Sequence, residues 1–566
     1  MKRCPECRRD YYDDTLLYCL DDGNALLEGP TSAEEPETLI LLPAEAPTRT
    51  QIQTTDQTAI LPLGVAVVEK AKGFDKRLLA ASFFLAIIVL GGWVGYRYFK
   101  PVASEPINSI AVLPFENRSG NADSEYLSDG LAESLIYRLS QIPDLKVSPT
   151  SSVFRYKGKE TDPQVIAKEL GVDSVMTGRI TQRGDNLTIS VNLVDTRNGK
   201  SLWGEQYERK MSELLATQRE IATTITQKLQ LQLGGSNAKG ITKKYTDSND
   251  AYQLYLKGRY HFARRTKDDV NKAIESYEQA LKLDPNFALA YARIAEAYNQ
   301  MSNYPYASPK EAFPKAKAAA ERAIAIDPTL SEAHAALGNT LTSYDWKWPD
   351  AEKSFKRALE LDPNSAAAHY RYGFEYLVSV GRTSEALAEV ERALEIEPLD
   401  PNMVANLSRI YLYDGQRERA LIQSRRAYEA DPSFVIGRLI YGLTLNASGA
   451  YADAITLSEK ELGNSPNSQH MLLVAGYAFG RSGRRVEAEA IIERFKEISK
   501  TQYVIPSFVA AVYGALGEKD KAFAELAKSI EEHDSWFKWG KVEPLFDTLR
   551  DDPRFAGLLK RMNLPE

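Results

Sequence analysis

A short helix end recurs six times in the C-terminal half of the chain. It reads ALKLDP, AIAIDP, ALELDP, ALEIEP, AYEADP and ELGNSP, with prolines at positions 285, 328, 363, 398, 432 and 466. Successive prolines are 43, 35, 35, 34 and 34 residues apart. A fixed period of roughly 20 to 50 residues marks a repeat architecture, in which each unit packs only on its neighbours. The C-terminal half is therefore expected to fold as an array of similar units.

The period of about 34 residues is typical of tetratricopeptide repeats (TPRs), each of which is a pair of antiparallel helices. Small residues occupy the positions where helices cross, such as Ala386 and Ala393 in the repeat that ends at Pro398. Two further units lack the proline but keep the register. We expect about eight repeats over residues 249–534, closed by a C-terminal cap over 535–566 that covers the last exposed face.

The first helices of such repeats line a concave face, which is the usual binding surface of a solenoid. The repeat register predicts a partner-binding groove of aromatic, amide and charged side chains: Glu296, Asn299, Asn339, Tyr370, Phe374, Arg409, Leu443 and Asn446. These groups suit an extended peptide or a helix, and the alternative is a solvated groove wall. Four aromatic and imidazole side chains are interpreted as packing residues, although an exposed tryptophan could anchor a partner: His334, His369, Trp346 and Trp348.

An uncharged run of 19 residues, from Leu78 to Tyr96, precedes the repeats. As a helix it would be about 28 Å long, which is close to the thickness of the bilayer hydrocarbon. We predict a single transmembrane helix over 78–98, with a buried core helix as the alternative. The N-terminal flank carries four positive charges and the other flank two, so the N-terminus is expected in the cytoplasm and the repeats outside a bacterial inner membrane.

All three cysteines lie in the first nineteen positions, ahead of a Thr- and Pro-rich stretch that we interpret as a flexible linker over 28–77. Cys4 and Cys7 form a Cys-x-x-Cys pair, and Cys19 and Asp22 repeat that spacing with an aspartate in the last place. Zinc accepts thiolate and carboxylate ligands, so residues 1–27 resemble a short zinc ribbon with a structural Cys3Asp site. A degenerate remnant and a redox pair are the alternatives.

Residues 101–235 alternate strand-like and helix-like segments and predict a compact α/β domain. Three strand-like runs follow one another at 173–182, 185–196 and 201–209, and turn-forming residues separate them as in β-hairpins. The stretches IAVLPFENRSG, SDGLAESLIYRLS, VDSVMTGRI and GKSLWGEQYER resemble the TolB amino-terminal-like domain. The resemblance implies a non-catalytic sensory or docking domain, placed beyond a membrane helix and before helical repeats.

No catalytic motif accompanies these domains: the sequence contains no Walker loop, HExxH, GxSxG, kinase block or cyclase block. The net charge of -7 and the pI of 5.6 do not favour nucleic-acid binding. The expected fold is multi-domain, with an α-solenoid of tetratricopeptide repeats preceded by a small α/β domain, a single transmembrane helix and a zinc ribbon. The expected function is a non-enzymatic membrane scaffold for a protein partner, and the alternative is a transmembrane signal transducer.

Overall fold

The computed structural model describes residues 107–120, 124–142, 145–229 and 243–565, together with three two-residue strands nearer the N-terminus. These strands are β1 (Lys2–Arg3), β2 (Asp10–Tyr11) and β3 (Leu27–Glu28), and β1 pairs antiparallel with the other two. Residues 1–101 and 102–566 are separate compact units. The predicted zinc ligands and the predicted span over 78–98 lie outside the described residues. Within the described part, no helix is both long enough and apolar enough to cross a membrane.

The predicted α/β domain is present, and its sheet has the strand order β6-β4-β7-β8-β9. The strands are β4 (Ser109–Val112), β5 (Glu116–Asn117), β6 (Lys146–Val147), β7 (Ser174–Arg183), β8 (Asn186–Asp195) and β9 (Lys200–Lys210). β4 pairs in parallel with β6 and β7, whereas β7, β8 and β9 form the antiparallel meander that the hairpin turns predicted. Alternate residues of β8 are buried, so one of its faces forms the core.

Six helical segments accompany this sheet in the described residues. They are α2 (Glu125–Ser140), α3 (Thr150–Val153), η2 (Phe154–Tyr156), α4 (Pro163–Leu170), η3 (Met211–Glu213) and α5 (Leu214–Lys228). α4 begins at a proline after the capping side chain of Asp162, and it ends at Gly171 in a left-handed conformation. These are ordinary start and stop signals of a helix.

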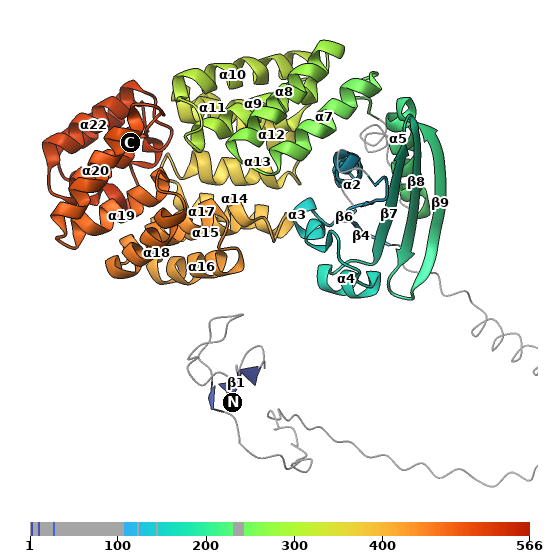
Figure 1. The fold of residues 1–566 in the computed structure, drawn as a ribbon, viewed down its shortest axis with the longest axis horizontal. Helices are drawn as coiled ribbons and strands as arrows, with labels where there is room; N and C mark the ends of the chain where they lie inside the picture. Colours follow the sequence, from blue (N-terminus) through green and yellow to red (C-terminus); the bar gives the residue numbers. More distant parts are fainter. Residues whose placement is uncertain are drawn as a thin grey trace, which may run out of the picture. The chain divides into compact units, whose positions relative to one another are not determined.

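Helix α2 lies between the sheet and the first repeat helix (Figure 1). A Cβ on Gly130 would lie 3.0 Å from the side chain of Leu256 in that repeat, so glycine allows a close approach of the two helices. The Tyr252 hydroxyl from the repeat contacts Ser134 on α2 at 2.5 Å and donates a hydrogen bond to Gln218 on α5 at 2.7 Å. One hydrophobic core therefore runs from the α/β domain into the repeats, across the domain boundary that the sequence suggested.

In the described part, eight helix pairs follow, as expected (Figure 1). Repeat 1 consists of α7 (Asn249–Phe262) and α8 (Lys267–Leu283), and repeat 2 of α9 (Ala288–Asn303) and α10 (Pro309–Ile326). In repeat 3, α11 (Ser331–Thr340) continues into η4 (Leu341–Asp345) and pairs with α12 (Trp348–Leu361). In repeat 4, α13 (Ala366–Tyr370) continues into η5 (Arg371–Leu377) and pairs with α14 (Thr383–Ile396). Repeats 5 to 8 are formed by α15 (Pro401–Tyr413) with α16 (Arg417–Ala430), α17 (Val435–Ala447) with α18 (Tyr451–Asn464), α19 (Gln469–Arg481) with α20 (Arg485–Ser499), and α21 (Pro506–Ala515) with α22 (Lys519–Glu531).

The small residues of the repeat register are fully buried between helices, including Ala358, Ala386 and Ala393. A Cβ on Gly373 would lie 2.9 Å from the carbonyl oxygen of Ala386, so the two helices of repeat 4 cross in direct backbone contact. The first helices of repeats 3 and 4 change from α to π geometry at η4 and η5. The repeat register did not predict this change, and π-helical turns are frequent at functional sites.

The C-terminal segment contains four short helices: η6 (Phe537–Trp539), η7 (Pro544–Phe546), α23 (Asp547–Arg550) and α24 (Pro553–Arg561). α23 and η7 pack on α21, and α24 packs on α22, so this part covers the last repeat as the predicted cap does. Residues 533–546, which include η6 and η7, also contact earlier repeats. We call them the C-terminal strap.

Candidate functional site

The C-terminal strap lies against the first helices of repeats 2 to 5, 7 and 8, on the concave face of the solenoid. Trp536 donates its indole N–H to the carbonyl of Asn303 in repeat 2 at 3.2 Å. Trp539 donates in the same way to the carbonyl of Phe374 in repeat 4, also at 3.2 Å. The ring of Trp536 also packs on Phe508 of repeat 8. The strap therefore crosses the groove instead of remaining at the end of the array.

Two buried ion pairs anchor the strap. Lys538, whose side chain is 0% exposed, lies 2.6 Å from the Oε2 atom of Glu375 and donates to the hydroxyl of Ser343 at 2.8 Å. Arg409 lies 2.9 Å from Glu543 and stacks over the ring of Trp539 at 4.4 Å. A buried charge is costly unless it has an oppositely charged partner. The strap and the groove are therefore complementary in charge as well as in shape.

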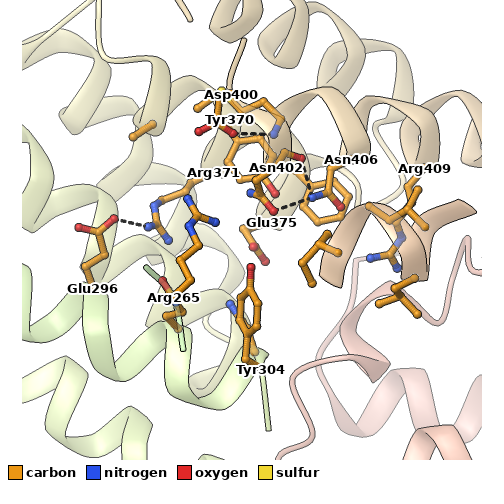
Figure 2. Close-up of a pocket in the computed structure, with 18 of the residues that line it drawn as sticks. Arg265, Glu296, Tyr304, Tyr370, Arg371, Glu375, Asp400, Asn402, Asn406 and Arg409 are labelled. Atoms are coloured by element: carbon orange, nitrogen blue, oxygen red, sulfur yellow. Dashed lines mark hydrogen bonds and ion pairs between the residues drawn. The ribbon is translucent and has the colours of Figure 1, made fainter. Parts of the chain in front are cut away.

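Beneath the strap, a cavity of about 200 Å³ remains open in the groove (Figure 2). Figure 2 shows Arg265 and Arg371 on one side of this cavity and Arg409 on the other. Trp536 and Trp539 form part of its wall, and Tyr304 from the long second repeat closes another side. The apolar part of the lining comes from repeats 4 to 6: Phe374, Met403, Ile436, Leu439 and Ile440.

Glu296 is the centre of a charge network at the edge of the cavity. Its two carboxylate oxygens accept hydrogen bonds from Arg293 and Arg371, each at 2.7 Å. Burial works to raise the pKa of Glu296, but the two guanidinium groups outweigh it and lower that pKa to about 2. This carboxylate is therefore ionised at neutral pH and already paired.

Arg265 differs from the other cations that line the cavity, because no carboxylate in the described ranges forms an ion pair with it. Its electrostatic neighbours are Tyr304, Asp400 and Tyr370. Its backbone is also unusual, with a left-handed φ of 57° in the turn between the helices of repeat 1. The equivalent turn position in repeats 4 to 8 is always a glycine with φ between 76° and 82°: Gly381, Gly415, Gly449, Gly483 and Gly517.

A side chain in this left-handed region costs about 1 kcal/mol or more relative to glycine. Repeat 3 accepts the same cost at Trp346, which has φ of 51°. Its indole stacks on the imidazole of His533 in the strap, with 4.5 Å between ring centroids and 17° between planes. The turns of repeats 1 and 3 therefore direct a large side chain toward the cavity and the strap, respectively.

The structure brings together four of the eight predicted groove residues, Glu296, Tyr370, Phe374 and Arg409, around this cavity. Their role in binding a partner stays a prediction. The other four are buried between helices and do not line the cavity, and their role in binding a partner also stays a prediction: Asn299, Asn339, Leu443 and Asn446. The first and last of these donate side-chain N–H groups at 3.0 Å to main-chain carbonyls in the next repeat. Such amides align neighbouring repeats instead of facing a ligand.

The four interpreted packing residues behave in two ways. His334 and His369 each contact the carbonyl of the proline six positions earlier, at 3.1 and 3.0 Å, which closes the turn between repeats. Trp346 and Trp348 are both buried, but their partners lie far away in sequence. The indole N–H of Trp348 donates to the carbonyl of Met562 at 2.8 Å, so these tryptophans secure the C-terminal segment.

Sequence reasoning missed Arg265, Gln300, Tyr304 and the strap residues. One signal was available in the repeat alignment. The glycine of the turn recurs in repeats 4 to 8, whereas repeats 1 to 3 lack it. Arginine takes its place in repeat 1 and tryptophan in repeat 3, and the longer turn of repeat 2 contains Pro305 with a φ of 25°. A replacement that costs backbone strain indicates a function for the new side chain.

Sequence models of three known families match the chain. Residues 106–224 match the second domain of the HilA/YgeH-like transcriptional regulators. Two TPR models match residues 263–302, 347–401 and 405–469. The helical part is a TPR solenoid. The resemblance of the α/β domain to TolB is not tested by these matches and stays a prediction.

Two curated relatives share part of the sequence. A putative adenylate cyclase 3 of Rhizobium meliloti is 29% identical over 235 residues, which cover 41% of this chain and 40% of that protein. The transcriptional regulator HilA of Salmonella typhimurium is 24% identical over 265 residues, which cover 44% of this chain and 45% of that protein. The chain thus spans less than half the length of each relative.

Solved TPR structures resemble the helical part. A TPR protein of Parabacteroides merdae aligns with 48% of this chain and 98% of its own length, at 15% identity and a TM-score of 0.33. A thermophilic TPR protein of Thermus thermophilus aligns with 34% of this chain and 98% of its own length, at 20% identity and a TM-score of 0.30.

Proposed function

We propose that the protein is a non-catalytic, membrane-anchored scaffold whose TPR groove binds an extended segment of a partner protein. TPR arrays are scaffolds for protein interactions, and their concave faces commonly hold extended peptides. The observation that carries this proposal is the strap, because the groove already holds an irregular segment of its own chain through two tryptophans and a lysine. A partner segment with aromatic side chains around a lysine would use the same contacts.

Two features make the groove suitable for exchange of one segment for another. The indoles of Trp536 and Trp539 donate to main-chain carbonyls of the groove, which are present whatever the neighbouring side chains are. The acidic group that receives the lysine, Glu375, is held in the π-helical turn η5. Aromatic anchors in desolvated pockets, flanked by a buried charge pair, are typical hot spots of an interface.

A labelled synthetic peptide of residues 533–546 tests the groove directly. We expect it to bind weakly to the full chain, whose own strap competes, and at least tenfold more tightly to a Trp536→Ala/Trp539→Ala chain, whose strap is weakened. Fluorescence anisotropy measures both affinities. The matched control is a peptide with both tryptophans and the lysine replaced by alanine. Equal binding of the two peptides, or binding of neither, contradicts the proposal.

The membrane anchor and its orientation form the second part of the proposal. The uncharged segment over 78–98 and the excess of positive charge before it support a cytoplasmic N-terminus with the α/β domain and repeats outside. A reporter fused after residue 566 that is active only outside the cytoplasm would agree with this orientation. Protection of the repeats from protease in intact spheroplasts, followed by digestion after lysis, would reverse it.

The alternative is a transmembrane signal transducer, in which binding outside the membrane alters the N-terminal zinc ribbon. The names of the two curated relatives favour this alternative, because one is a transcriptional regulator and the other a putative adenylate cyclase. Co-purification of the full chain from membranes distinguishes the two functions. A stoichiometric partner under all growth conditions supports the scaffold, whereas a partner that changes with conditions supports the transducer.

A further inference from the structure

We propose that the cavity beneath the strap is a binding site for a small amino acid, held by its carboxylate at Arg265. This site goes beyond the proposed peptide groove, because its ligand is a small molecule and its key residue comes from repeat 1 and not from the strap. The inference rests on the turn of repeat 1, on an unsatisfied amide, and on the size and charge of the cavity.

The first observation is the arginine in a glycine position. Repeats 4 to 8 form the same turn with glycine and without strain, so the backbone of repeat 1 gains nothing from a side chain there. The turn also receives extra support, because the Tyr306 hydroxyl from the long second repeat donates to the main-chain carbonyl of Arg265 at 3.0 Å. The guanidinium lines the cavity without a carboxylate in ion-pair contact among the described residues.

The second observation is an unused donor on the same wall. The Nε2 atom of Gln300 is buried and has no hydrogen-bond partner in the described part of the chain, although its side chain lines the cavity. A buried donor without an acceptor is costly, and such groups in a pocket indicate a missing ligand. Arg265 and Gln300 both line the cavity and carry N–H donors, and a carboxylate accepts hydrogen bonds from such groups.

The remaining lining favours a positive or donating group on the rest of the ligand. Asp400 lies on the wall near Tyr370, and Glu397 lines the cavity beside it. Asn402 adds an amide oxygen that also accepts a hydrogen bond from Asn406 at 3.2 Å. A second carboxylate on the ligand would be repelled here, whereas an ammonium group would find several acceptors.

The volume restricts the ligand further. A cavity of about 200 Å³ is smaller than the roughly 300–1,000 Å³ of drug-sized pockets and equals the liquid volume of about seven water molecules. A free amino acid fits this space. Because Trp536 and Trp539 form part of the wall, the ligand also holds the strap in place.

The test uses the full chain and a panel of the twenty common L-amino acids. Isothermal titration calorimetry measures affinity, and each binding amino acid is compared with the amine that lacks its carboxylate and the acid that lacks its amino group. We expect at least one amino acid to bind and both of its analogues to bind at least tenfold more weakly. Failure of the whole panel overturns the proposal, as does equal binding of the analogues.

Two variants separate a ligand residue from a structural one. Arg265→Gly restores the turn residue of the later repeats, so we expect an unchanged or higher melting temperature and at least a hundredfold loss of affinity. Gln300→Leu is expected to weaken binding tenfold or more without unfolding the chain. Arg264→Ala changes the neighbouring exposed arginine and should leave affinity intact. A marked fall in the melting temperature of Arg265→Gly, or full binding by it, contradicts the site. The amino-acid titrations do not use the strap peptide. A negative result in the peptide-binding test therefore does not decide whether the cavity binds an amino acid, and the reverse also holds.

Discussion

Arg409 and Glu543 lie 134 positions apart in the chain, yet their side chains form a buried ion pair with 2.9 Å between Nη2 and Oε2. Removing one partner of such a pair leaves a buried, uncompensated charge. We expect Glu543→Ala to destabilise the repeats by about 3–5 kcal/mol, measured by thermal denaturation of the full chain. Asp547→Ala serves as the control, because it breaks a more exposed pair with Arg550 and should cost under about 1 kcal/mol. Equal effects of the two changes would disagree with the burial of the Arg409 pair.

Trp346→Gly should lower the melting temperature, whereas Arg265→Gly should leave it unchanged or raise it. Glycine relieves the left-handed strain but removes a buried indole and its stacking on His533. Loss of a buried tryptophan costs about 3–5 kcal/mol, which exceeds the strain of about 1 kcal/mol. We therefore expect a lower melting temperature and faster proteolysis within residues 533–546. Stabilisation by Trp346→Gly would show that the stacking contributes little.

The helix-crossing positions provide a test of the repeat register. Ala393 is fully buried in α14, whereas Ala388 on the same helix is exposed. Ala393→Arg forces a charge into a helix contact and should destabilise the array by roughly 3 kcal/mol or more. Ala388→Arg should change stability by less than about 0.5 kcal/mol. Circular dichroism during thermal melting compares both variants, and similar curves would contradict the packing.

Glu397 should make stability depend on pH near neutrality. Burial, reinforced by Asp400, raises the pKa of Glu397 to about 7, against the opposing effects of the Ser151 hydroxyl and Arg265. Its ordinary pKa is 4.5, so the folded protein binds the proton more tightly than the unfolded chain between these values. Protonated Glu397 therefore contributes to the free energy of unfolding at low pH. This contribution, up to about 3 kcal/mol, is lost as the pH rises from about 4.5 to 7. Denaturation curves recorded across that pH range measure how the free energy of unfolding changes with pH. Glu397→Gln should abolish this change, and an unchanged pH dependence in the variant would refute the role of Glu397.

The N-terminal segment yields a prediction that the described residues leave open. Residues 1–27 are expected to bind one zinc ion through Cys4, Cys7, Cys19 and Asp22, because the two pairs share one spacing. Metal analysis of the full chain should show one zinc per molecule, and Cys4→Ser should release it. Full retention of zinc by Cys4→Ser would exclude the site. Retention by Asp22→Ala alone would exclude only the fourth ligand.

The repeat architecture could be predicted because it depends on local signals that recur. The proline after each second helix, the small residues at the crossings and the hairpin turns of the α/β domain each act within a few residues. These signals located the long strands β7 to β9. They also identified eight repeats in the described part of the chain.

The site could be predicted only in part, because it depends on contacts between distant segments. A helical register shows which side chains share a face, but it cannot show that a strap from the C-terminus covers that face. Asn299 and Asn446 satisfied the register of a groove and are instead buried against the next repeat. The π-helical turn at η5 further shifts Phe374 and Glu375 relative to an α-helical register.

The strap has a consequence for how the array unfolds. An open solenoid contacts itself only between neighbours, so its terminal repeats fray first and its stability is a sum along one dimension. Here the strap joins Asn303 in repeat 2 to the end of repeat 8, and Trp348 in repeat 3 is tied to Met562. The last repeats cannot detach without breaking contacts near the first ones. Hydrogen exchange should therefore report a single cooperative opening from repeat 2 to repeat 8, with no gradient of protection falling toward the C-terminus.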